Sequence, residues 1–166
     1  MKIAFFHGLE SPAVSDKSEY LQGKFPDAYT PAIDYNNPSS FDEVLKQVKD
    51  RKIDLLVGSS MGGWFAYCIS TLTGIPTVLF NPGVQGRTFD PNVRIGSKAA
   101  KHQVVLGKRD EVLAPIKTVA WFKENGIGTP KFNWESNDHR TPLNIFQKYI
   151  SMNEKYVMTF ESFCNR

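Results

Sequence analysis

The chain of 166 residues has the length of one domain, and an apolar share of 41% is enough to build a single core. The net charge of +3 is small and no long run of Lys or Arg occurs, which argues against a nucleic-acid-binding protein. No apolar run approaches the roughly 20 residues that cross a bilayer, and the N-terminus lacks the apolar region of a signal peptide. We therefore expect a cytoplasmic protein without a nucleic-acid or membrane partner.

Cysteine usage points to the same compartment. The two cysteines, Cys68 and Cys164, are not spaced as in a disulfide framework, and Cys68 lies within an apolar stretch. A free cysteine of this kind usually behaves as a small buried hydrophobic residue. We expect neither a structural disulfide nor a metal site, and no other cofactor is indicated, which is consistent with a reducing compartment.

Short apolar runs alternate with longer helical stretches along the chain. The runs expected to form strands are 2–7, 28–34, 53–58, 76–81, 102–107 and 131–135. The stretches expected to form helices are about 15–24, 41–50, 60–73, 115–125 and 142–150. Val, Ile, Leu and Phe fill several runs without polar alternation, as is typical of strands buried on both faces. The pattern predicts an α/β fold, a three-layer α/β/α sandwich with a mostly parallel sheet of about six strands, as a single domain over 1–166.

The third run leads into the motif G-x-S-x-G, with Gly58, Ser60 and Gly62 at its fixed positions. A strand precedes it and a helix is expected after it, which is the arrangement of a nucleophile elbow. The serine oxygen has to project from a sharp turn, and glycines two residues before and after the serine avoid a clash there. The alternatives are a plain glycine-rich turn and a phosphate-binding turn, although no Lys-Ser/Thr pair follows as a Walker motif requires.

Backbone donors for a developing oxyanion are expected at two positions near this serine. Acyl transfer uses one N–H after the nucleophile and one from a neighbouring strand–helix loop, which here are those of Met61 and Leu9. Gly8 lets the first loop turn close to the substrate. We interpret His7 as a strand-end histidine that hydrogen-bonds the loop and takes no part in proton transfer.

The acid and the base are expected after the fifth and sixth runs. Asp110 follows the fifth run, with Glu111 as the fallback, and a solvated surface turn is the alternative reading of both. His139 follows the sixth run in a polar loop, whereas His102 begins a strand at the opposite end. The resulting order Ser60, Asp110, His139 is the chain order of nucleophile, acid and base in α/β-hydrolases.

At this point the sequence resembles the α/β-hydrolase superfamily, and within it small bacterial esterase-like proteins of uncharacterised function. The matching pieces are Phe6-His7-Gly8-Leu9, Gly58-Ser59-Ser60-Met61-Gly62-Gly63, Asn81-Pro82, Gly107 to Val112, and His139. The resemblance implies a triad of Ser60, Asp110 and His139, an oxyanion hole at Leu9 and Met61, and hydrolysis of an ester or thioester of a small acyl substrate. Many members have two further strands before the first one here, and a larger cap where this chain has only a short cap or loop at about 82–101.

Other functions stay open at the level of sequence. The chain could be a non-catalytic binding protein that kept the hydrolase fold, a scaffold protein in which the motif is coincidental, or a small peptidase or amidase. A further hypothesis concerns Arg87, Arg94, Lys98 and Lys101, which would attract anionic substrates if they surrounded the site. An ordinary solvated loop is the alternative for that segment. The oligomeric state does not follow from the sequence.

Overall fold

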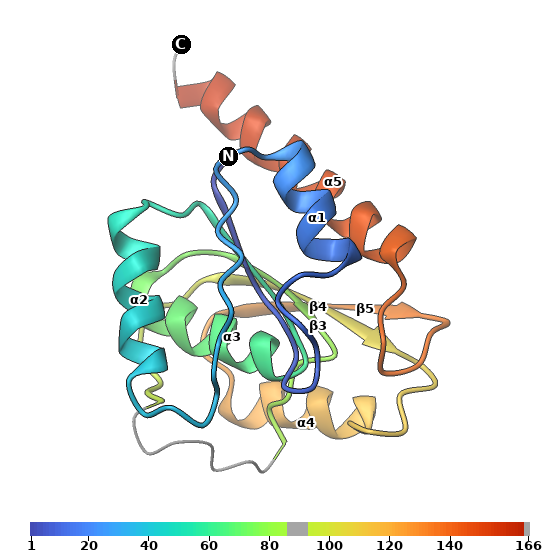
Figure 1. Cartoon of the computed structure of the whole chain (residues 1–166). Helices are drawn as coiled ribbons and strands as arrows, with labels where there is room; N and C mark the ends of the chain where they lie inside the picture. The colour runs from blue at the N-terminus through green and yellow to red at the C-terminus, as the bar shows by residue number, and fades with distance from the viewer. Residues whose placement is uncertain (86–92, 165–166) are drawn as a thin grey trace.

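A five-stranded parallel sheet runs through the protein in the computed structural model, which describes residues 1–85 and 93–164 (Figure 1). The strands lie side by side in chain order: β1 (Ile3–Phe6), β2 (Leu55–Ser59), β3 (Thr77–Phe80), β4 (Lys101–Gly107) and β5 (Thr129–Glu135). Every neighbouring pair is parallel, so the carboxyl ends of all five strands lie at one edge. Ligand sites of open α/β sheets lie beyond that edge.

The helices cover the two faces of the sheet in two groups (Figure 1). On one face lie α2 (Ser40–Asp50), α3 (Met61–Thr73) and α4 (Pro115–Asn125), and on the other lie α1 (Asp16–Lys24) and α5 (Leu143–Cys164). The helices of the first group directly precede β2, β3 and β5, and they lie on one side because parallel crossovers are right-handed. The three-layer α/β/α architecture predicted from the sequence is confirmed.

Adjacent residues of one strand show how the sheet divides the core. Phe5 packs against Phe146 of α5, with ring centroids 5.3 Å apart. The next residue, Phe6, points to the opposite face and belongs to the buried cluster that contains Phe41 of α2 and Phe65 of α3. Side chains of a strand alternate between its two faces, and both faces are covered here. The apolar runs without polar alternation therefore reflect burial on both sides.

The sheet has five strands where about six were predicted, because the run 28–34 adds no strand. Tyr29 makes a single bridge to Ala4, with Tyr29 N–H donating to the Ile3 carbonyl at 2.8 Å. Two residues later, the next hydrogen bond of a parallel ladder would come from the N–H of residue 31. That residue is Pro31, which has no N–H, so the pairing stops after one step.

Two other expectations concern the connections. The predicted helix 142–150 and the tail after it form one continuous helix, α5, which extends to Cys164. In the segment 82–101, the described residues form a loop until β4 begins at Lys101, and the rest of the segment lies outside the described residues. Within the described part of the chain, none of the helices combines the length and apolar character needed to cross a membrane.

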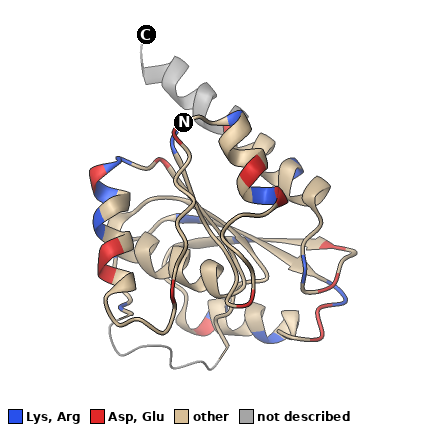
Figure 2. Cartoon of the chain, in the orientation of Figure 1, with Lys and Arg blue, Asp and Glu red and all other residues tan. Residues whose placement is uncertain are grey.

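Charged side chains of both signs are interspersed on the helices rather than gathered on one element (Figure 2). Helices α1 and α2 each carry lysines and acids, whereas β1, β2 and β3 contain no charged residue. This distribution follows from burial. An unpaired charge in the middle of the sheet would lower the free energy of unfolding by several kcal/mol, because the charge would lose its hydration.

A buried histidine lies at the amino end of the sheet, away from the carboxyl edge. His102 is 1% exposed, and its Nε2–H donates to the Ile127 carbonyl at 2.7 Å while its Nδ1 accepts from the Thr77 hydroxyl at 3.0 Å. Burial lowers the pKa of His102 from its ordinary value of 6.5, and the hydrogen bond to Ile127 partly opposes this shift. The folded protein therefore favours the neutral imidazole.

This burial predicts a pH-dependent stability below neutrality. As the pH falls through about 6.5, the unfolded chain binds a proton at His102 that the folded chain does not bind until its lower pKa is reached. The contribution of His102 to the free energy of unfolding is thus complete above pH 6.5 and declines below it, by at most about 1.4 kcal/mol per pH unit.

Urea unfolding of the wild type and of His102→Gln between pH 5 and 7.5 measures the effect. We expect the variant to be less stable at pH 7.5 and to show a flatter pH dependence below 6.5. Identical slopes for the two proteins would show that His102 is not the group responsible.

Candidate active site

Ser60 lies on a sharp turn between β2 and α3, where the sequence motif predicts an elbow. Its φ and ψ are 53° and −115°, a positive φ that few non-glycine residues adopt. Two hydrogen bonds hold this conformation: Ser60 N–H donates to the Phe80 carbonyl at 3.0 Å, and Gly83 N–H donates to the Ser60 carbonyl at 2.8 Å. The strain of such a residue, about 1–3 kcal/mol, persists only where the surroundings enforce it, which is common at functional sites.

The two motif glycines allow the turn to close against the sheet. A Cβ on Gly58 would lie 2.1 Å from the Gly62 carbonyl oxygen, and a Cβ on Gly62 would lie 2.0 Å from that of Phe6. Both neighbours are backbone atoms, so no side-chain rotation could relieve either clash. The elbow therefore needs glycine at both positions, and Gly62 brings the start of α3 directly against the end of β1.

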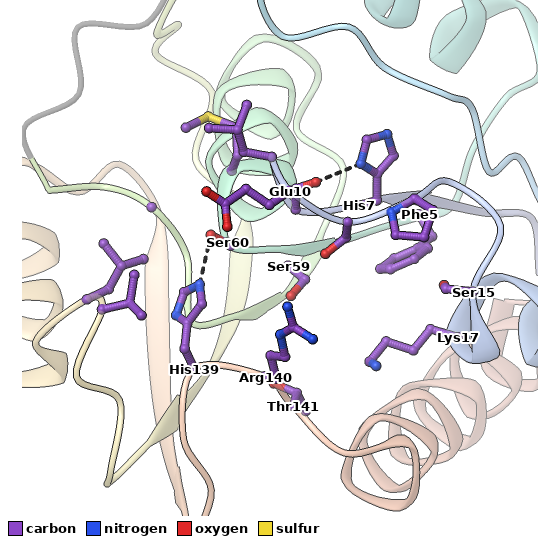
Figure 3. Close-up of a pocket in the computed structure, with 18 of the residues that line it drawn as sticks. Phe5, His7, Glu10, Ser15, Lys17, Ser59, Ser60, His139, Arg140 and Thr141 are labelled. Carbon is purple, nitrogen blue, oxygen red and sulfur yellow. Dashed lines mark hydrogen bonds between the residues drawn. The ribbon is translucent and has the colours of Figure 1, made fainter.

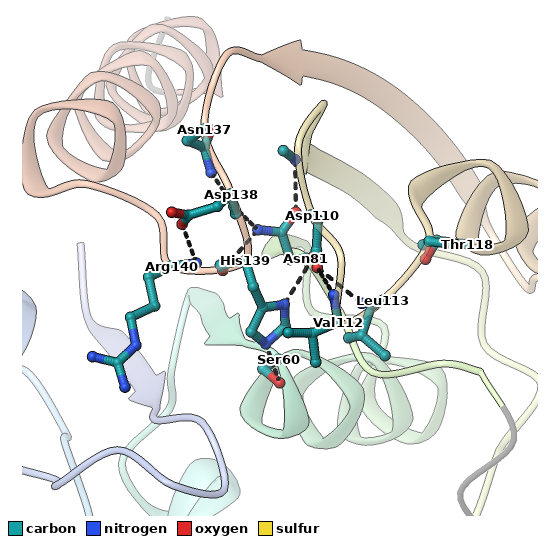
Figure 4. A network of polar contacts seen from close by, with 12 residues as sticks. Ser60, Asn81, Asp110, Val112, Leu113, Thr118, Asn137, Asp138, His139 and Arg140 are labelled. Carbon is teal, nitrogen blue, oxygen red and sulfur yellow. Dashed lines mark hydrogen bonds and ion pairs between the residues drawn. The ribbon is translucent and has the colours of Figure 1, made fainter.

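The three residues predicted as nucleophile, base and acid form one hydrogen-bonded chain (Figure 4). His139 Nε2 lies 3.0 Å from Ser60 Oγ, and His139 Nδ1 lies 2.8 Å from Asp110 Oδ2. An ionised carboxylate only accepts hydrogen bonds, so Nδ1 carries the proton and Nε2 is free to accept from the serine hydroxyl. This is the tautomer in which the imidazole can remove a proton from Ser60.

The second oxygen of Asp110 fixes the carboxylate in place. Oδ1 accepts from the N–H groups of Val112 and Leu113, at 2.9 and 2.8 Å, and the side chain is only 1% exposed. These two backbone donors determine the orientation of the carboxyl group. The fallback residue Glu111 lies on the exposed side of the same turn.

The sequence analysis quoted Asn81 only as part of the family resemblance, and the structure gives it a positioning role. Asn81 follows β3 with a φ of 42°, and its Nδ2 donates to the carbonyls of Asp138 and His139 at 3.2 and 2.9 Å. Its Oδ1 accepts from Gly107 N–H at 2.7 Å, which links the ends of β3 and β4 (Figure 4). One amide thus holds the loop that contains His139 and the strand that leads to Asp110.

The two predicted backbone donors lie beside Ser60. A Cβ on Gly8 would be 3.5 Å from Ser60 Cβ, which places the loop after β1 against the elbow. Met61 is the first residue of α3, where a backbone N–H has no partner within the helix. Among the described residues, neither Leu9 N–H nor Met61 N–H donates a hydrogen bond. Both residues line the same cavity as Ser60.

The side chain of His7 supports the loop after β1 and, among the described residues, makes no hydrogen bond with Ser60 (Figure 3). Its Nδ1 lies 2.7 Å from the Gly8 carbonyl and its Nε2 accepts from Ile33 N–H at 3.0 Å, so both ring nitrogens are occupied. The His7 carbonyl accepts from the Tyr35 hydroxyl at 2.5 Å. Burial raises the pKa of Tyr35, which keeps this hydroxyl protonated as a donor.

A cavity of about 480 Å³ opens over Ser60. Its wall is formed by the loop between β1 and α1, by the elbow and by the loop after β5, which contributes His139 (Figure 3). A volume of this size accommodates a small organic ligand. Among the described residues, no three His, Cys, Asp or Glu side chains gather closely enough to hold a metal ion.

The basic residues of the segment 82–101 that the structure describes lie away from this cavity. Arg94 pairs with Asp42 of α2 at 2.5 Å, Lys98 N–H donates to the Thr71 carbonyl near the end of α3, and Lys101 begins β4 at the amino edge of the sheet. None of them lines the cavity, and Arg87 lies outside the described residues. The hypothesis that this segment attracts substrates finds no support in its described part.

Solved structures with low sequence identity share the fold. A candidate hydrolase of the α/β superfamily from Xanthomonas campestris is 16% identical, with a TM-score of 0.68 over 88% of this chain and 91% of that one. Est1E from Butyrivibrio proteoclasticus is 12% identical, with a TM-score of 0.65 over 96% and 88%. The fluorophosphonate-binding serine hydrolase FphF from Staphylococcus aureus is 15% identical, with a TM-score of 0.60 over 93% and 82%.

Sequence comparison identifies the family. A UPF0227 protein from Shewanella loihica is 28% identical over 157 residues, which covers 74% of this chain and 87% of that protein. The family model UPF0227, described as an uncharacterised protein family, matches residues 2–93, which is more than half of the chain. This protein therefore has the α/β-hydrolase fold and belongs to the UPF0227 family.

Proposed function

We propose that this protein is a serine hydrolase that cleaves a carboxylic ester or thioester through an acyl-serine intermediate. The chain of contacts from Asp110 through His139 to Ser60, with separations of 2.8 and 3.0 Å, is the observation that carries the proposal. A binding protein that had lost catalysis would not need all three side chains, the required tautomer and a strained nucleophile turn together. The α/β-hydrolase fold of the chain agrees with this reaction and does not by itself establish it.

In the proposed reaction, His139 Nε2 takes the proton of Ser60 as the serine oxygen attacks the substrate carbonyl carbon. The N–H groups of Leu9 and Met61 stabilise the negative oxygen of the tetrahedral intermediate. His139 then gives its proton to the leaving alcohol or thiol, and an acyl-serine remains. A water molecule, activated by the same imidazole, repeats the attack and releases the acid. Asp110 holds the imidazole and stabilises its cation.

A fluorophosphonate probe tests the proposal directly, because it reacts with an activated serine and requires no knowledge of the substrate. We expect covalent labelling of the wild type and none of Ser60→Ala. The matched control is Ser97→Ala, which removes an exposed serine outside the cavity and is expected to label like the wild type. Equal labelling of the wild type and Ser60→Ala, or no labelling of a folded wild type, would contradict a serine hydrolase.

Hydrolysis rates with a panel of substrates then identify the class of bond that the protein cleaves. Short- and long-chain 4-nitrophenyl esters, acyl thioesters and amides of small acids would be compared by kcat/KM. We expect esters or thioesters to be hydrolysed and Ser60→Ala to be inactive on them. Preferred turnover of amides would instead indicate a small peptidase or amidase.

A further inference from the structure

The cavity over Ser60 contains two cationic side chains that the proposed mechanism does not use. Lys17 lies in the first turn of α1, and Arg140 directly follows His139. Both line the cavity, and Figure 3 shows the ends of both side chains reaching into it beside Ser59. These cations come from two segments far apart in the sequence and meet at the same space next to the candidate nucleophile.

The charge of Arg140 is not neutralised within the described part of the chain. Its backbone N–H donates to Asp138 Oδ1 at 2.9 Å, but no described residue makes a hydrogen bond or ion pair with its guanidinium. Lys17 Nζ contacts Asp16 Oδ1 at 3.3 Å, and the lysine side chain is only 19% exposed whereas that of Asp16 is 54% exposed. Because the carboxylate of Asp16 is exposed to solvent, this contact contributes little, and Lys17 retains attraction for a further anion.

A third polar group at this wall also has no partner. Thr141 is 3% exposed and lines the cavity, and its Oγ1 is buried without a hydrogen-bond partner in the described structure. Buried hydroxyls are nearly always hydrogen-bonded, so a missing partner at a cavity wall requires an explanation. A rotation of the Thr141 side chain toward the cavity would let this hydroxyl donate to an oxygen atom of a ligand bound beside Arg140.

We propose that the substrate carries an anionic group, a carboxylate or a phosphate, which Arg140 and Lys17 bind while the ester carbonyl lies at Ser60. This inference rests on the proposed function and specifies the class of substrate. A guanidinium binds two oxygens of a carboxylate or phosphate at once, and the lysine adds a second charge. Because Arg140 follows His139, an anion bound there also fixes the distance between the substrate and the reacting side chains. Two acids, Glu10 and Asp16, line the cavity as well, so the preference depends on the anion reaching the cationic wall formed by Arg140 and Lys17.

Two matched pairs of esters test the substrate class. One pair, 4-nitrophenyl hexanoate and mono-4-nitrophenyl adipate, differs by a carboxylate on the acyl chain. The other pair, 4-acetylphenyl and 4-carboxyphenyl hexanoate, differs by a carboxylate on the alcohol part. We expect the wild type to prefer the anionic ester of at least one pair by about 10-fold or more in kcat/KM. Hydrogen bonds to charged groups contribute enough free energy for a difference of this size. A phosphonate-terminated analogue of the adipate ester distinguishes a carboxylate from a phosphate preference.

Variants assign the preference to the two cations. Arg140→Gln is expected to lower kcat/KM for the preferred anionic ester by about 10- to 100-fold, and Lys17→Gln by about 3- to 10-fold, since Asp16 already offsets part of its charge. Rates with the neutral partner ester should change less than about 3-fold, which shows that His139 is undisturbed. Lys123→Gln, an exposed change in α4 outside the cavity, controls for the loss of net charge.

The possible outcomes separate this inference from the function on which it rests. Hydrolysis of neutral and anionic esters at equal rates, with Arg140→Gln lowering both equally or neither, overturns the anion site and leaves the hydrolase intact. A wild type that hydrolyses none of the esters and does not react with a fluorophosphonate overturns the proposed function and this inference with it. A preference that Arg140→Gln and Lys17→Gln remove, and Lys123→Gln keeps, supports the anion site.

Discussion

Replacing Asp110 by asparagine is expected to lower kcat by roughly 10⁴-fold while the protein stays folded. Oδ1 of Asp110 accepts from two backbone N–H groups, so the oxygen of an asparagine has to take that position. Its NH₂ group then faces His139 Nδ1, which can satisfy it only as an acceptor. The proton of the imidazole moves to Nε2, and the nitrogen beside Ser60 can no longer remove the serine proton.

Steady-state kinetics with an activated ester, together with circular dichroism, would measure this effect. Asp138→Asn is the matched control, because Asp138 lies next to His139 in the chain but its carboxylate, among the described residues, accepts a hydrogen bond only from the N–H of Arg140. We expect the control to keep activity within a few-fold of the wild type. If Asp110→Asn lost less than about 10-fold, the carboxylate would not be orienting the imidazole and Asp110 would not be the acid of the site.

The position of the three side chains could be predicted from the sequence because each one follows a strand of a parallel sheet. Ser60 follows β2, Asp110 follows β4 and His139 follows β5, and parallel strands end at the same edge. The strand pattern and a single motif were therefore enough to expect them at one edge. The distances between them required the order of the strands, which apolar runs do not reveal.

The contacts that the sequence did not predict depend on neighbours in space rather than along the chain. Asn81 joins the loop of His139 to the end of β4, and its positive φ cannot be recognised from its residue type alone. The cationic wall has the same origin, because the approach of Lys17 to Arg140 depends on where the first turn of α1 faces. The strand predicted at 28–34, which the structure lacks, has a different explanation. Pro31 can be read from the sequence, and its missing N–H explains why the pairing with β1 ends.

Replacing Gly62 by alanine is expected to destabilise the protein by about 3 kcal/mol or more, an effect at the upper end for a single added methyl group. The new Cβ would lie 2.0 Å from the carbonyl oxygen of Phe6, so the end of β1 or the start of α3 has to move. Either movement also displaces Leu9 relative to Met61, and any residual activity should fall further than the folded fraction does. Gly23→Ala is the control, since Gly23 lies in α1 with nothing within 4 Å of the added Cβ, and it should be neutral or stabilise by about 0.5–1 kcal/mol. Urea unfolding compares the two variants, and a Gly62→Ala protein as stable as Gly23→Ala would mean that β1 and α3 do not approach each other this closely.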